Sequence, residues 1–239
     1  MSAHRLFTLF HKWITLIIGI QIVLWVAGGV VMSFFDIDKV RGDHNVRERE
    51  TQVISADTDL ISQSFALEQA GLSATRITTR FLLETPVYEV TSEAGKTVVL
   101  DAATGKKIPP VDEAMATALA REDFAGDDEI ASIKLLDKAG YEYRGGPLPA
   151  WQIIFSDADA THIYVSVDRA RVTARRNGVW RIFDFFWMLH IMDYDERDDF
   201  NHPLLIIASI IALVGSLSGI GLYFYRFRRR DFAWILPKK

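Results

Sequence analysis

Two long apolar segments without a charged residue dominate the hydrophobic pattern of the chain, one near each end. They cover residues 13–35 and 203–225, 23 residues each. A helix needs about 20 residues to cross the roughly 30 Å hydrocarbon core of a bilayer. Both segments are therefore predicted to be transmembrane helices. The first is also longer than the apolar core of a cleaved signal peptide, about 7 to 15 residues, so we expect it to stay as an anchor.

Between these segments the pattern is that of a folded domain with mixed secondary structure. Alternating apolar and polar positions bounded by turn residues predict strands, and a 3.6-residue apolar period predicts helices. The predicted helices cover residues 59–71 and 112–121. The predicted strands cover 76–83, 87–91, 97–101, 130–136, 151–155, 162–167 and 172–175.

The order helix and then strands occurs twice, and short segments of the two halves can be aligned. Pro86 to Val90 aligns with Pro149 to Ile153, and Val99 to Asp101 aligns with Ser166 to Asp168. A repeated order of this kind is typical of a duplicated unit. We expect an α+β fold with two tandem units, each burying one face of an antiparallel sheet under a helix.

The predicted organisation has eight segments. They are a cytoplasmic stub (1–12), a first transmembrane helix (13–35), a juxtamembrane segment (36–54), the two repeat units (55–110 and 111–177), an interfacial aromatic helix with an acidic loop (178–202), a second transmembrane helix (203–225) and a basic cytoplasmic tail (226–239).

The distribution of charge predicts how the chain crosses the membrane. Residues 36–202 hold 30 acidic and 19 basic residues, whereas the two ends are basic. Loops rich in Lys and Arg stay in the cytoplasm. Both termini are therefore predicted to be cytoplasmic and the central domain periplasmic, in the inner (plasma) membrane of a bacterium. An acidic domain also repels phosphate, which argues against a nucleic-acid partner.

The absence of cysteine excludes several kinds of chemistry. Disulfides, thiolate metal sites, iron–sulfur clusters and cysteine nucleophiles all need this residue. No phosphate-binding loop, dinucleotide fingerprint or nucleophile motif is present either. We therefore do not expect a complete enzyme in this chain alone.

Small and polar residues inside the apolar segments predict helix contacts. Gln21 lies in the middle of the first apolar segment. Its side chain could pair with Ser209, Ser216 or Ser218 of the second apolar segment. Two further pairs have the spacing of close-packing positions: Gly29 with Ser33, and Gly215 with Gly219. These positions allow the two helices of one chain to pack together, and they equally allow dimerisation or docking on a partner.

Histidines are the candidate cofactor ligands. A 23-residue helix spans about 35 Å, so His11 and His202, at opposite faces of the membrane, do not share one haem. His44, His190 and His202 all fall near the outer membrane surface among several Asp and Glu residues. Imidazole and carboxylate groups together could hold haem, iron or a divalent metal there. The alternative is a polar collar at the headgroups.

His190 is the most informative of the three. On a helix covering 180–192 it falls nearly opposite Arg181 and Asp184, among aromatic residues such as Trp187. A histidine on an apolar face is also commonly a hydrogen-bonded core residue. The aromatic side chains of this segment predict a helix lying at the membrane interface.

Several short motifs resemble those of PepSY-associated transmembrane proteins. They are Tyr88-Glu89-Val90, the run from Val98 to Lys106, His11-Lys12-Trp13, Leu24-Trp25 with Gly28-Gly29, the run from Asp38 to His44, the run from Leu189 to Tyr194, and Ser218-Gly219. The resemblance covers nearly the whole chain. Larger members have four helices and include iron-regulated membrane proteins and ferric-siderophore reductases, some linked to flavin reductase modules.

The resemblance implies an accessory role in iron, haem or electron transfer, with haem b or iron as cofactor. This chain has two predicted spans and no flavin or nicotinamide domain, so it would need a second copy of itself or a membrane reductase or transport partner. Other PepSY domains restrain proteases. The alternative is therefore a non-enzymatic, membrane-tethered module that binds or regulates another protein.

Overall fold

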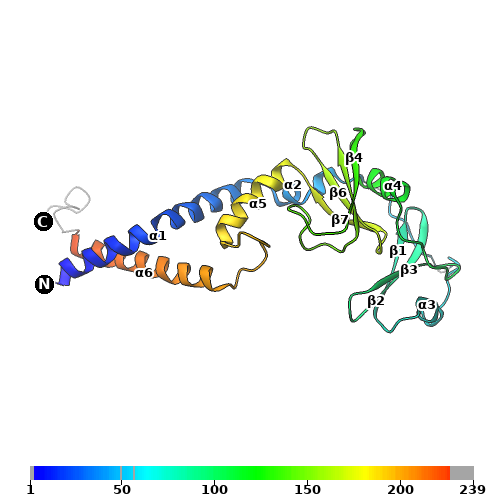
Figure 1. The fold of residues 1–239 in the computed structure, drawn as a ribbon, viewed down its shortest axis with the longest axis horizontal. Helices are drawn as coiled ribbons and strands as arrows, with labels where there is room; N and C mark the ends of the chain where they lie inside the picture. Colours follow the sequence, from blue (N-terminus) through cyan, green and yellow to red (C-terminus); the bar gives the residue numbers. More distant parts are fainter. Residues whose placement is uncertain (1–2, 49, 56, 227–239) are drawn as a thin grey trace, which may run out of the picture. The chain divides into compact units, whose positions relative to one another are not determined.

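Apolar helices near both ends of the chain precede and follow two antiparallel sheets in the computed structural model, which describes residues 3–48, 50–55 and 57–226 (Figure 1). The chain divides into a helical unit, Met1–Phe35 with Ile182–Lys239, and a sheet unit, Asp36–Arg181. Residues 227–239, which make up nearly all of the predicted basic tail, lie outside the described residues.

In the part of the chain that the structure describes, the helical unit consists of α1 (Ala3–Phe34), most of α5 (Gly178–Ile191) and α6 (Pro203–Arg226). α1 and α6 run alongside each other (Figure 1). Only 11% of the most apolar stretch of α1 and 22% of that of α6 is buried, unlike the core helices of a soluble protein. Both helices could therefore cross a membrane. α1 begins at Ala3, so the helix also covers most of the segment predicted as a stub, residues 1–12.

The sheet unit contains the same succession of elements twice. α3 (Gln63–Ala70) precedes the sheet β1 (Ala74–Leu82), β2 (Thr85–Ser92) and β3 (Thr97–Asp101), with strand order β1-β2-β3. α4 (Glu113–Asp123) precedes β4 (Ile130–Leu136), β5 (Ala150–Phe155), β6 (His162–Ser166) and β7 (Arg171–Arg176), with order β4-β5-β6-β7. All neighbouring strands are antiparallel.

Local sequence explains where the two sheet-covering helices begin. The hydroxyl of Ser62 accepts a hydrogen bond from the Phe65 amide at the start of α3, and the carboxylate of Asp112 accepts one from the Met115 amide at the start of α4. Side-chain caps of this kind satisfy amides that have no partner within the helix. Gly71 then ends α3 in a left-handed conformation, with φ of +68°.

The register of the sheets corrects the second predicted repeat alignment. Val87 pairs with Asp101 in the first sheet, and Ala150 pairs with Ser166 in the second. The structural equivalent of Asp101 is therefore Ser166 and not Asp168. Side chains alternate faces with a period of two, so a shift of two residues keeps the same face inward and leaves the apolar pattern unchanged.

Both faces of β2 and β3 are buried, although one covered face per sheet was predicted. Tyr88, Val90 and Leu100 pack under α3 with Ala66 and Ala70. The opposite face joins the second half in one core, whose members include Val87, Val99, Ala116, Leu119, Phe124, Ile153, Phe155, Ile163 and Val165. The two halves therefore share a hydrophobic core, which follows from the four consecutive buried residues of β2.

The juxtamembrane segment belongs to the sheet unit. It forms α2 (Ile37–Arg41) and the short 3-10 helix η1 (Asp43–Asn45). Arg47 donates its amide to the Asp123 carbonyl at 2.8 Å, and the Ala125 amide donates to the Asn45 carbonyl at 3.0 Å. These bonds attach the segment that follows α1 to the end of α4.

Candidate cofactor site in the helical unit

The site begins with the close packing of α1 against α6. A Cβ at Gly215 would lie 2.9 Å from the Ile14 side chain, and a Cβ at Gly219 would lie 3.0 Å from the His11 ring. Ile18 of α1 and Ala208 and Ala212 of α6 form the buried centre of this contact. The structure thus places Gly215 and Gly219 against the other helix of the same chain, the first of the two predicted possibilities.

The other predicted packing pair lies elsewhere. A Cβ at Gly29 would have no atom within 4 Å, and the Ser33 hydroxyl donates to the Val30 carbonyl of its own helix. The neighbouring Gly28 is the one at a helix crossing, since its Cβ would lie 3.6 Å from the Phe186 carbonyl oxygen and 3.7 Å from His190 Nδ1. The sequence contained Gly28-Gly29, and the apolar pattern alone did not say which of the two faces α5.

Three side chains satisfy carbonyl groups at the end of α5, where a helix leaves its last carbonyls without a partner. Gln21 Nε2 donates to the Leu189 carbonyl at 3.0 Å, and Trp25 Nε1 donates to the His190 carbonyl at 2.7 Å. His202 Nε2 lies 2.9 Å from the Ile191 carbonyl, which makes this nitrogen the donor. Gln21 was predicted to meet serines of α6, and instead it caps α5.

The loop from α5 to α6 is attached to α5 by buried polar contacts. Arg197 forms an ion pair with Asp184, and both side chains are less than a tenth exposed. Trp187 Nε1 donates to the Arg197 carbonyl at 3.0 Å. Burial acts to raise the pKa of Asp193, but backbone amides of the loop, with Asp199 foremost, outweigh it and hold this pKa below its ordinary value.

A cleft of about 500 Å³ lies where α1, α5 and this loop meet. Its lining includes Trp25, Trp187, His190, Phe200, Leu205 and Ser209. Ligand sites in proteins typically have volumes of about 300 to 1,000 Å³ and are mostly apolar with a few polar groups. Three aromatic rings and one imidazole therefore give this cleft the composition of a ligand site.

The imidazole of His190 lines this cleft. Its Nδ1 is buried and has no hydrogen-bond partner among the residues that the structure describes. An unpaired buried nitrogen costs roughly 1 to 3 kcal/mol, so an imidazole in this state calls for an explanation. In contrast, His11 Nδ1 donates to the Ser218 hydroxyl at 2.8 Å, because that hydroxyl itself donates to the Gly215 carbonyl at 2.7 Å.

The other two predicted ligands have different surroundings. His202 lies in a separate acidic cleft of about 400 Å³, beside Asp193, Asp195, Glu196 and Asp199. His44 lies in the sheet unit, 3.9 Å from the Asp159 carboxylate. Among the described residues, no three His, Asp or Glu side chains converge as a metal site would require.

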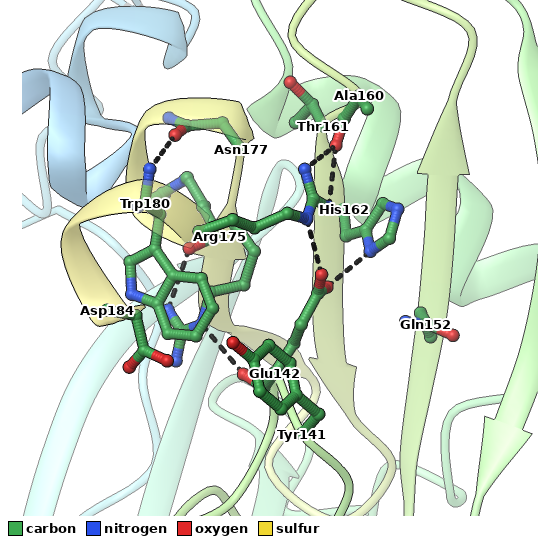
Figure 2. A network of polar contacts seen from close by, with 12 residues as sticks. Tyr141, Glu142, Gln152, Ala160, Thr161, His162, Arg175, Asn177, Trp180 and Asp184 are labelled. Atoms are coloured by element: carbon green, nitrogen blue, oxygen red, sulfur yellow. Dashed lines mark hydrogen bonds and ion pairs between the residues drawn. The ribbon is translucent and has the colours of Figure 1, made fainter. Parts of the chain in front are cut away.

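The sheet unit contains a separate polar network centred on Glu142 (Figure 2). Its carboxylate accepts hydrogen bonds from Arg181 Nε at 2.6 Å, His162 Nδ1 at 2.6 Å and the Tyr164 hydroxyl at 2.9 Å. Burial acts to raise the pKa of Glu142, but the bonds from His162, Arg181 and Tyr164 outweigh it and lower this pKa to about 2. This cluster could not be recognised in the sequence, because the partners of Glu142 lie 20 to 39 residues away from it.

Asn177 connects the two segments that lead to the apolar helices. This residue is 3% exposed, and its Nδ2 donates to the Lys39 carbonyl of α2 at 2.8 Å. Its Oδ1 accepts from the Trp180 amide at 2.7 Å and so caps the start of α5. One buried amide thus holds both the segment after α1 and the segment before α6.

Comparisons with family models, with curated proteins and with solved structures give no match to this chain.

Proposed function

We propose that this chain is a bacterial inner-membrane protein of the PepSY type whose helical unit binds haem b, and that it acts as an accessory in iron, haem or electron transfer. In this proposal both termini are cytoplasmic and the sheet unit is periplasmic. The observation that carries the proposal is His190, which lines an aromatic cleft and whose buried Nδ1 has no hydrogen-bond partner among the residues that the structure describes.

The residues of the cleft fit such a group. Haem iron commonly takes an axial histidine, and flat aromatic and aliphatic walls suit a porphyrin. His190 would be the ligand, and Trp25, Trp187 and Phe200 would provide the walls. Trp25 also binds the His190 carbonyl and therefore fixes the backbone that carries the ligand. A bound haem would supply one-electron transfer.

The sheet unit supports a role other than catalysis. Glu89 and Asp123 are buried and Glu142 is partly buried, and each of these carboxylates lies within ion-pair distance of an arginine. For Glu142 these contacts lower the pKa to about 2, so this carboxylate is poorly suited to accept a proton at neutral pH. In the proposal, electrons come from a membrane reductase or transport partner, or pass to a second copy of the chain.

One observation favours a second function, a tethered module that binds or regulates another protein. Within the described residues β1 is an edge strand that pairs only with β2. An exposed edge can accept a strand from a partner, as in other peptide-binding domains. This function requires no bound cofactor.

The test is a dithionite-reduced minus oxidised visible spectrum of the full chain purified in mild detergent. We expect sharp haem bands from the wild type and from His44→Ala, whose side chain lies in the sheet unit. We expect them to be lost in His190→Ala. His202→Ala should keep the bands but lower the melting temperature, because it removes a cap of α5. A flat spectrum for the wild type would leave the tethered module as the proposed function.

A further inference from the structure

α6 runs along only part of α1. The two helices are antiparallel, and a Cβ at Gly215 of α6 would lie against Ile14 of α1. Continued along both helices, this register places Pro203, the first residue of α6, near Val26 of α1. Because α1 continues to Phe34, roughly 12 Å of it extends past the start of α6.

α5 lies beside this end of α1 and also reaches below the start of α6 (Figure 1). A Cβ at Gly28 would lie 3.6 Å from the Phe186 carbonyl oxygen, so the two helices cross there. Met192, directly after α5, packs against the buried cluster that contains Ala208 in the second turn of α6. The end of α5 therefore lies roughly 7 Å deeper along α6 than Pro203.

The last carbonyls of α5 are bonded to side chains rather than left to solvent. Gln21, Trp25 and His202 donate to the three successive carbonyls of residues 189–191, at 3.0, 2.7 and 2.9 Å. Water can satisfy the end of a helix at a protein surface, whereas hydrocarbon offers no hydrogen-bond donor. Gln21 lies in the middle of an apolar helix, where a polar side chain is costly and needs such a partner. These caps are what a helix that ends within a bilayer requires.

α5 presents an exposed apolar face above this end. Ile182 and Phe185 are 49% and 47% exposed, and Leu189 follows on the same face at helical spacing. On the neighbouring end of α1, Val30 and Phe34 are mostly exposed as well. Apolar surface thus continues past the level at which α6 begins.

The chemistry of this surface matches lipid acyl chains. Residues 182–192 contain no Glu, Lys or Arg, and their one aspartate, Asp184, is buried in an ion pair with Arg197. The surface is also continuous along the chain of contacts with α1, which is apolar and largely unburied and could cross a membrane. A surface of this kind in water would be costly, whereas acyl chains cover it without loss.

We infer that α5 is a re-entrant helix. It enters the leaflet at the C-terminal end of α1, contacts acyl chains through Ile182, Phe185 and Leu189, and ends in the hydrocarbon region under its side-chain caps. A helix lying flat at the membrane interface, as the aromatic residues predicted, would not need those caps. The inference rests on the proposed membrane location but not on a bound haem.

The test measures depth with spin labels on single-cysteine variants of the full chain in nanodiscs. The chain has no cysteine of its own, so each label reports one position. Labels are placed at Ile182→Cys, Phe185→Cys and Leu189→Cys. Oxygen concentrates among acyl chains and a nickel chelate stays in water, so the ratio of their collision rates with a label increases with depth.

We expect this ratio to increase from Ile182→Cys through Phe185→Cys to Leu189→Cys, because the three positions span roughly 10 Å of helix. Leu189→Cys should match Ile207→Cys, which is exposed near Ala208 on α6. Glu93→Cys, in an exposed turn of the sheet unit, should give a ratio at least twofold below all of these. Ile182 and Phe185 are half exposed, so their two variants test the gradient even if Leu189→Cys does not fold.

Leu213→Cys, on an exposed position in the middle of α6, separates the two ways in which the inference can fail. A label there that collides mainly with the nickel chelate would refute the membrane location and the inference with it. If that label lies in lipid, equal ratios along α5 would show a flat helix, and ratios as low as that of Glu93→Cys would show a helix in water. Labels on α5 that neither probe reaches would show that a protein covers it. Each of these three results would overturn the inference alone.

Discussion

Replacing Glu142 with glutamine tests the network at the start of α5. The carboxylate is 15% exposed and binds Arg181 and His162. Its pKa is lowered from 4.5 to about 2. At about 1.4 kcal/mol per pKa unit, this depression corresponds to roughly 3 kcal/mol of folding free energy at neutral pH. Glu142→Gln should therefore lower the free energy of unfolding by about that amount at pH 7.

The sign of the pH dependence follows from the direction of the shift. A carboxyl whose pKa is lower in the folded state stabilises the fold above its unfolded pKa, and this contribution is lost as pH falls from about 4.5 towards 2. The difference between wild type and Glu142→Gln should therefore shrink over this range.

The assay is urea unfolding of the full chain in non-ionic detergent, followed by tryptophan fluorescence between pH 3 and pH 7. Glu93→Gln is the matched control, because Glu93 is exposed in the turn between β2 and β3. Parallel pH curves for the wild type and Glu142→Gln would refute the reasoning, as would an equal loss of stability in Glu93→Gln.

Two further predictions concern single positions. Asn177→Ala removes the donor to Lys39 and the cap of α5, so we expect a loss of about 1 to 3 kcal/mol and faster hydrogen exchange at the amides of α2 and at the Trp180 amide. Unchanged exchange at both places would contradict the bridging role. Gly215→Ala should lower the melting temperature by several degrees, because its Cβ would lie 2.9 Å from a side chain of α1, whereas Gly29→Ala should leave it unchanged. Equal melting temperatures for the two variants would show that α1 and α6 do not pack as described.

Local patterns in the sequence predicted most of the secondary structure. β4 has the predicted bounds, Ile130–Leu136, and α6 begins at the predicted Pro203. Strand alternation, caps and turn residues are properties of neighbouring positions, so they can be recognised without the fold. The two-residue error in the repeat alignment had the same origin, because a period of two cannot distinguish Ser166 from Asp168.

Contacts between distant segments could not be predicted in this way. Asp123 binds Arg175 through two hydrogen bonds of 2.6 Å, although 52 residues separate them. Likewise, Gln21 was recognised as a polar residue in need of a partner, but its partner is a carbonyl of α5 and not a side chain of α6. Any backbone carbonyl at a helix end can receive such a donor, and the sequence does not mark which one does.

The most direct test of the haem proposal is chemical rescue at His190. The full-length His190→Gly variant should lose the haem bands of the wild type, and added imidazole should restore them by entering the space that the side chain leaves. Imidazole should have no effect on the wild type. If His190→Gly keeps the bands without imidazole, or if the wild type shows none, His190 does not hold a haem and the central claim fails.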